Sequence, residues 1–214
     1  MRYQYKCIGI DMPLEHIFKV PYEVGLVINW LLGFIMVCLL YLLWRVYRKH
    51  YVSTWTTKCV ARITVLLALS IMGAQIQIGG GGVALDSMPG FFAAGYFGFI
   101  EGVTVCILGC IASHIFGGLI GLIPIIWTSY PAMGLAAGLY AYTYRRFKSP
   151  LNCVLAIICA ILVNTFGCLI PIAFVLGGLA FLVVWTPVLL YAATLNTVLA
   201  TILIEVLKRF RRTI

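Results

Sequence analysis

The residues best suited to ligand chemistry flank a run of four glycines. Gln75 and Gln77 precede this run, and Asp86 and Ser87 follow it. The run itself consists of Gly79, Gly80, Gly81 and Gly82. Amide, hydroxyl and carboxylate groups can all form hydrogen bonds to a ligand. Four consecutive glycines do not form a stable helix, because glycine loses more backbone entropy on ordering than any other residue. We therefore expect Gly79–Gly82 to form a loop that acts as the lid of a small-molecule site.

The motif Asp86-Ser87-Met88-Pro89 has the form of a helix start. Asp and Ser side chains accept hydrogen bonds from the first free amides of a helix, and proline is favoured in its first turn. The Asp86 carboxylate could cap this helix, bind a ligand, or do both. The sequence leaves these alternatives open.

Five further polar and aromatic residues lie within apolar segments, at depths that match the glycine loop. They are His114, Trp127, Tyr130, Asn164 and Trp185. Polar groups inside a membrane are costly, and small-molecule sites combine apolar and aromatic walls with a few polar groups. We expect these five residues to surround a substrate together with the residues that flank the glycines.

Each of the five also has a structural alternative. His114 could bond a backbone carbonyl, and Asn164 could join two helices. The aromatic side chains could belong to the aromatic belt at the membrane surface.

Catalytic and metal chemistry have weaker support. One carboxylate, Asp86, and one histidine, His114, form neither a triad nor a metal cage, and a metal would need further ligands. The sequence has no P-loop, Gly-x-Ser-x-Gly or His-Glu-x-x-His motif. We expect no enzyme activity, no cofactor and no metal. An intramembrane enzyme that uses this pair and a structural or assembly protein without ligand are the alternatives.

The composition requires a bilayer as solvent. The 214 residues are 63% hydrophobic and only 10% charged, whereas about a quarter of a soluble domain is charged. The net charge of +9 comes from basic residues that flank apolar segments. This placement indicates topology signals and lipid headgroups rather than nucleic acid.

Apolar segments of about 17–25 residues cross a bilayer as helices. The chain is therefore predicted to be an all-α membrane protein. Seven spans are expected, at approximately 24–45, 61–78, 86–101, 102–118, 122–144, 151–169 and 180–206.

The basic residues also predict an orientation. With the N-terminus outside, twelve of the fifteen Lys and Arg residues fall on the cytoplasmic side, as the positive-inside rule requires. The C-terminus is then cytoplasmic, the protein lies in the cell membrane, and the glycine loop faces outward. Cys7 and Cys168 share that outer face, but nothing in the sequence argues that they pair.

Two small residues in the second span, Ser70 and Ala74, have small-xxx-small spacing. Such a face lets another helix approach closely. It could contact a second protein or serve packing within the bundle.

One stretch of the sequence resembles a known family. Residues 83–94 read Val-Ala-Leu-Asp-Ser-Met-Pro-Gly-Phe-Phe-Ala-Ala, followed by Gly98, by Glu101-Gly102, and by Leu108-Gly109 with Ser113-His114. With the helix count, the basic loops and the outer glycine loop, these residues resemble the substrate-binding S components of energy-coupling factor (ECF) vitamin transporters. The subgroup they resemble most is the one assigned to cobalamin precursors such as α-ribazole.

The resemblance implies a six-helix substrate-binding domain at 59–214. Residues 1–58 would add an interfacial segment, one extra transmembrane helix and a basic loop, which departs from the six helices and inner N-terminus usual in the family. It also implies that the protein captures a vitamin or vitamin precursor outside without hydrolysing anything. A transmembrane coupling protein with two ATPases, contacted through Ser70 and Ala74, would then drive its release inward.

Overall fold

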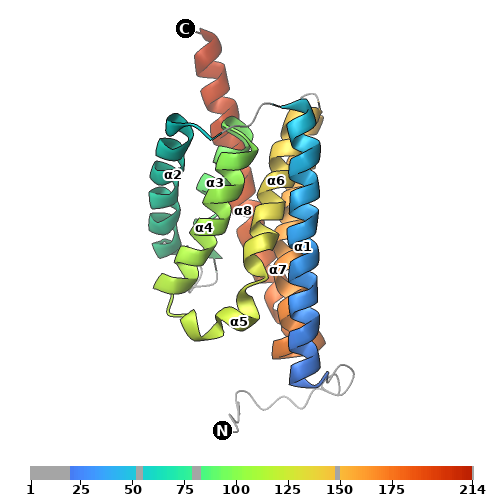
Figure 1. Ribbon diagram of the computed structural model, residues 1–214. Helices are drawn as coiled ribbons and strands as arrows, with labels where there is room; N and C mark the ends of the chain where they lie inside the picture. The colour runs from blue at the N-terminus through green and yellow to red at the C-terminus, as the bar shows by residue number, and fades with distance from the viewer. Residues whose placement is uncertain (1–19, 52–54, 79–82, 148–149, 214) are drawn as a thin grey trace.

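The computed structural model describes residues 20–51, 55–78, 83–147 and 150–213. Its helices run along a common axis and form one bundle (Figure 1). The elements are α1 (Tyr22–His50), α2 (Thr57–Gln75), β1 (Gln77–Ile78), β2 (Val83–Ala84), α3 (Met88–Tyr96), α4 (Phe99–Phe116), η2 (Ile120–Leu122), α5 (Ile123–Ile126), α6 (Ser129–Arg146), α7 (Leu151–Leu176) and α8 (Gly178–Thr213). The prediction of an all-α membrane protein is confirmed, apart from one short β-ladder.

Five of the described helices are long and apolar enough to cross a bilayer: α1, α2, α4, α7 and α8. The segments Ile120–Ile126 and Ser129–Arg146 make a sixth span if they are counted together, and they meet at a bend of 61°. The described part of the chain therefore has up to six such spans, not the seven predicted.

The difference lies in the third predicted span, 86–101. Helix α3 has only nine residues, which gives roughly 14 Å of rise where a bilayer core needs about 30 Å. The chain breaks at Gly98, whose φ of 146° suits glycine alone, and α4 begins at Phe99. Hydropathy predicts a single span here because it does not register this break. The β1–β2 ladder and α3 together lead the chain back along the bundle, and we call this return the third pass. In Figure 1 the helices before and after it, α2 and α4, therefore run in the same direction.

Helix α1, the predicted extra span, packs on the rest of the bundle at its α6 and α7 side. Gly25 lies against the backbone carbonyl of Phe174, and Gly33 lies against the Trp127 ring. The buried Asn29 donates from Nδ2 to the Ile125 carbonyl at 2.7 Å. This carbonyl lies in α5, just before the bend into α6, so α1 supplies a hydrogen bond where the span is broken.

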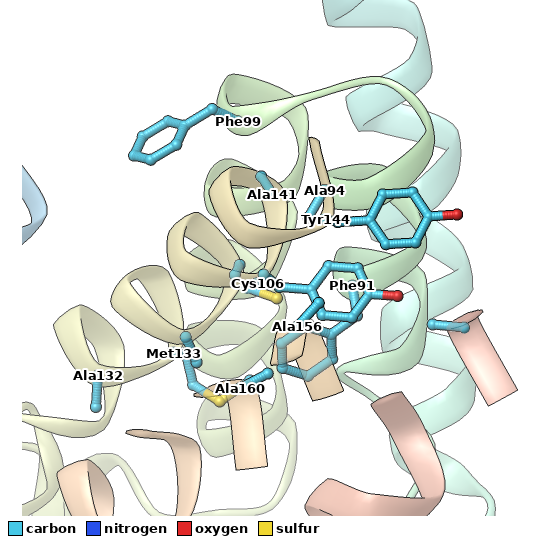
Figure 2. Close-up of a cluster of buried hydrophobic side chains, with 14 of the residues drawn as sticks. Phe91, Ala94, Phe99, Cys106, Ala132, Met133, Ala141, Tyr144, Ala156 and Ala160 are labelled. Atoms are coloured by element: carbon cyan, nitrogen blue, oxygen red, sulfur yellow. The ribbon is translucent and has the colours of Figure 1, made fainter. Parts of the chain in front are cut away.

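The core of the bundle combines buried alanines with a few large rings. Figure 2 shows Phe91 close to Cys106, with Ala156 and Ala160 of α7 near them. Lipid provides no hydrophobic drive for helices to associate, so close backbone approach through small residues stabilises such bundles. Gly102 of α4, for example, lies directly against the backbone of Ala94 in α3.

Basic side chains collect at one end of the bundle, which we call the basic end. This is the end at which α1 and α6 finish, α2 and α7 begin, and α8 projects furthest (Figure 1). Two contacts illustrate its packing. Arg145 Nη2 donates to the Phe97 carbonyl at 2.6 Å, and Arg62 lies 3.6 Å from the Glu101 carboxylate. The opposite end is formed by the α4–α5 turn and the α7–α8 turn.

The contact between α3 and α4 yields the first prediction. Gly102→Ala should lower thermal stability, because the added methyl group would overlap the Ala94 backbone and overpacking costs about 1–3 kcal/mol. Gly121→Ala is the matched control, since no heavy atom lies within 4 Å of its Cβ position. Thermal unfolding of both variants in detergent measures the difference. Equal stability of the two variants would contradict the close packing of α3 on α4.

Candidate ligand-binding cavity

A cavity of about 470 Å³ lies between the β2–α3 segment and the helices α4, α6, α7 and α8. Its α7 wall consists of residues three or four positions apart, and so does its α8 wall, which places each set on one helix face. The α7 residues include Asn164, Cys168, Ile172 and Leu176, and the α8 residues include Phe181, Trp185, Leu189, Ala192 and Asn196.

Polar and apolar lining residues separate by depth. The α7–α8 turn at Gly177 lies at the end opposite the basic end. Leu176 and Phe181 are near this turn, whereas Asn164 and Asn196 are more than about three helical turns away from it. The cavity therefore has polar groups at its inner end and apolar or aromatic groups toward its outer end, as a small-molecule site requires.

Asp86 lies at the polar inner end. Its Oδ2 accepts a hydrogen bond from Ser113 Oγ at 3.3 Å, and its backbone carbonyl accepts one from Ser70 Oγ. No ion pair to Asp86 is found among the residues that the structure describes. The N-cap position of α3 belongs to Ser87, whose side chain makes no capping hydrogen bond.

The start of α3 is capped instead by Asn196, from α8. Its Oδ1 accepts from the Met88 amide at 2.8 Å, and its Nδ2 donates to the Ala84 carbonyl at 2.9 Å. This buried side chain thus ties two backbone groups of the third pass to a helix more than a hundred residues further along the chain. Asn196 is missing from the predicted site residues, although an asparagine inside an apolar span is itself a signal.

His114 and Tyr130 form a pair at one side of the cavity. His114 lines the cavity, and its Nδ1 lies 3.4 Å from the Tyr130 hydroxyl. Tyr130 therefore does not line the cavity itself but contacts His114, which does. Because Asp86 and His114 bond to different partners, the geometry shows no acid–base pair between them.

The two predicted tryptophans lie in different places. Trp185 lines the cavity and is 42% exposed near its outer end. Trp127 turns away from it, and its ring lies 4.8 Å from Trp30 and 5.7 Å from Phe34 of α1, measured between centroids. Tertiary packing of α1 decides this orientation.

The remaining predicted residues lie around the third pass. Ser87 and Asn164 line the cavity. Gln75 is exposed at the end of α2, and the backbone of Gln77 pairs with that of Ala84.

The predicted lid connects β1 to β2, and the structure does not test it. All four of its residues fall outside the described part of the chain: Gly79, Gly80, Gly81 and Gly82. The described residues on either side, Ile78 and Val83, pair with each other in the ladder. The lid therefore stays a prediction.

The two small residues predicted to contact a coupling protein are not equally accessible. Ser70 is buried against Gly109 and bonds to the Asp86 backbone, whereas Ala74 is half-buried. In this conformation Ser70 fits the alternative of packing within the bundle.

No group of three His, Cys, Asp or Glu side chains is arranged to hold a metal ion within the described ranges. Cys168 lines the cavity as a free thiol, with its Sγ 3.7 Å from Asn164 Oδ1. Cys7 falls outside the described residues.

Comparison with known families gives one match. Residues 58–208, more than half of the chain, match the family model described as "ECF transporter, substrate-specific component". This range contains α3 to α7, most of α2 and α8, and every described residue that lines the cavity. No curated protein and no solved structure matches the chain.

The role of Asn196 yields the second prediction. Asn196→Leu should lower thermal stability and expose the Met88 amide to hydrogen exchange, because two buried backbone groups lose their partner at about 1–3 kcal/mol each. Thr194→Ala is the control, since its exposed hydroxyl bonds only to the Leu190 carbonyl within its own helix. Protection of residues 84–88 that is unchanged in Asn196→Leu would show that the third pass does not depend on this side chain.

Proposed function

The chain belongs to the family of ECF transporter substrate-specific components, and we propose that it captures a vitamin or vitamin precursor at the outer face of the cell membrane. It is a multi-pass membrane protein and the substrate-binding subunit of an importer. Proteins of this family work with a coupling protein and ATPases. In our proposal the substrate binds in the cavity beside Asp86 and is released inward when these partners act.

The observation that carries this proposal is the position of the cavity. Five of the nine residues predicted to bind substrate line it: Asp86, Ser87, His114, Asn164 and Trp185. They come from four separate parts of the chain, so their convergence depends on the fold. Tyr130 supports the site through His114, and Gln75 and Gln77 lead from α2 into the proposed lid at Gly79–Gly82.

We infer the orientation of the protein in the membrane from the position of its basic side chains. Loops rich in Lys and Arg remain in the cytoplasm, so we place the basic end inside and the opposite end outside. The α4–α5 turn, the α7–α8 turn and the aromatic end of the cavity then lie toward the outer surface. The start of α1 is outside and the end of α8 is cytoplasmic.

The chain carries no phosphate-binding motif, which supports the need for separate ATPase subunits. We place the contact with the coupling protein on α2. Its exposed face carries the small residues Ala61 and Ala68 beside Val65 and Met72, and the half-buried Ala74 borders this face. A face of small and apolar side chains lets a second transmembrane helix approach closely.

The third prediction tests the function. Ala192→Phe should abolish saturable binding of the compound that copurifies with the protein, because Ala192 lines the cavity and the added ring would occupy space that the ligand needs. Val183→Phe, at a position 61% exposed on the same helix, should bind normally. Uptake by cells should require the coupling protein and ATPases in addition to an intact cavity. Concentrative uptake by this chain alone, in a host without those subunits, would refute the proposal.

The fourth prediction tests the orientation. A membrane-impermeant thiol reagent applied to intact cells should label Gly121→Cys, in the turn before α5, above the level of the parent protein. It should not label Thr57→Cys, at the start of α2 on the basic end, until the cells are opened. The reverse pattern would invert the topology and place the aromatic end of the cavity toward the cytoplasm.

A further inference from the structure

We propose that the substrate is a nitrogen base. By this we mean a small molecule that presents a protonated or N–H-bearing nitrogen to Asp86 and carries no carboxylate, phosphate or other anionic group. This inference rests on the transport function proposed above. It specifies the substrate class that the cavity accepts.

The segments that line the cavity contain no lysine or arginine side chain. No Lys or Arg occurs between residues 63 and 144 or between 149 and 207, and these stretches supply every residue that lines the cavity. An anionic ligand would therefore meet no cationic side chain of these segments, and it would face the carboxylate of Asp86. Two like charges repel strongly where water is largely excluded, so the site discriminates against anions.

Asp86 has no counter-charge among the residues that the structure describes. The hydrogen bonds to its carboxylate come from neutral groups, namely the Ser113 hydroxyl at 3.3 Å and the amide and hydroxyl of the adjacent Ser87. The ion pairs found among the described residues, Arg62–Glu101 and Lys208–Glu205, involve other carboxylates. Within a membrane an ionisable group without a charged partner marks a functional site. A ligand N–H or ammonium group would complete its hydrogen bonding with a charge-assisted bond.

Polar groups and aromatic rings lie at different depths along the cavity. Asp86 and Asn164 lie at the inner end, and Phe181 and Trp185 lie toward the outer end. A ligand that fits this order directs its nitrogen group inward and its flat, apolar body outward against the aromatic rings. The volume of about 470 Å³ lies within the range of about 300–1,000 Å³ that is typical for small-molecule ligands.

The fifth prediction uses two matched series of probes. One series is pyridoxamine, pyridoxine and 4-pyridoxate, which share a pyridine ring and carry an aminomethyl, a hydroxymethyl and a carboxylate group at the same position. The other consists of the 2-aminomethyl, 2-hydroxymethyl and 2-carboxylate derivatives of quinoline. Binding to the purified full chain in lipid nanodiscs is measured by titration, for the wild type, Asp86→Asn and Glu205→Gln. Glu205 is the matched control, because its carboxylate lies on α8 outside the cavity and pairs with Lys208.

We expect the wild type to bind the aminomethyl member at least about tenfold more tightly than the carboxylate member in the series that fits. Asp86→Asn should reduce the preference for aminomethyl over hydroxymethyl about tenfold or more, and Glu205→Gln should retain it. Preference of the wild type for a carboxylate, or a preference for aminomethyl that survives in Asp86→Asn, would overturn this inference. A copurified compound with a carboxylate or phosphate group would also overturn it. All three results leave the transport function intact. Failure of all six probes to bind, with no copurified compound, would overturn the transport function itself and this inference with it.

Discussion

The structure depends on hydrogen bonds to the irregular backbone between β2 and α3, in the third pass. A bilayer tolerates irregular backbone only where protein groups satisfy its hydrogen bonds. Because α3 has nine residues, the segment before it leaves polar backbone groups without helical partners. Asn196 bonds the Ala84 carbonyl and the Met88 amide, and Ser70 bonds the Asp86 carbonyl. These two side chains hold the irregular segment in the bundle and place the Asp86 carboxylate at the inner end of the cavity.

A second irregularity shapes another wall of the cavity. The span formed by α5 and α6 bends by 61°, and Ile126 and Ser129, on either side of the bend, both line the cavity. Asn29 of α1 bonds the Ile125 carbonyl at this point. Helix α1 lies outside the matched residues 58–208, yet it supports the broken span that forms part of the site. The extra helix is thus an integral part of the bundle.

Basic side chains lie at one end of the bundle, whereas the cavity contains a carboxylate and no Lys or Arg side chain among its lining residues. The Lys and Arg residues of the described helices gather at the basic end, where Arg62 and Lys208 pair with Glu101 and Glu205. Two acidic residues remain in the described part of the chain. Glu23 lies at the start of α1, and Asp86 lies in the cavity, where its hydrogen-bond partners are neutral. The same distribution is therefore the basis both of the proposed orientation and of the proposed role of Asp86 in selecting a ligand.

The sequence by itself determined the all-α membrane class and the end of the bundle at which the basic residues collect. These properties depend on local hydropathy, charge and helical rise, which neighbouring residues fix. Only the tertiary structure decided that the third pass is a short ladder and a short helix, because a break at Gly98 does not change hydropathy. Only packing turned Trp127 toward α1 and brought Asn196 to the start of α3. Contacts between residues a hundred positions apart leave no periodic pattern in a sequence, so they follow from the packing of the helices alone.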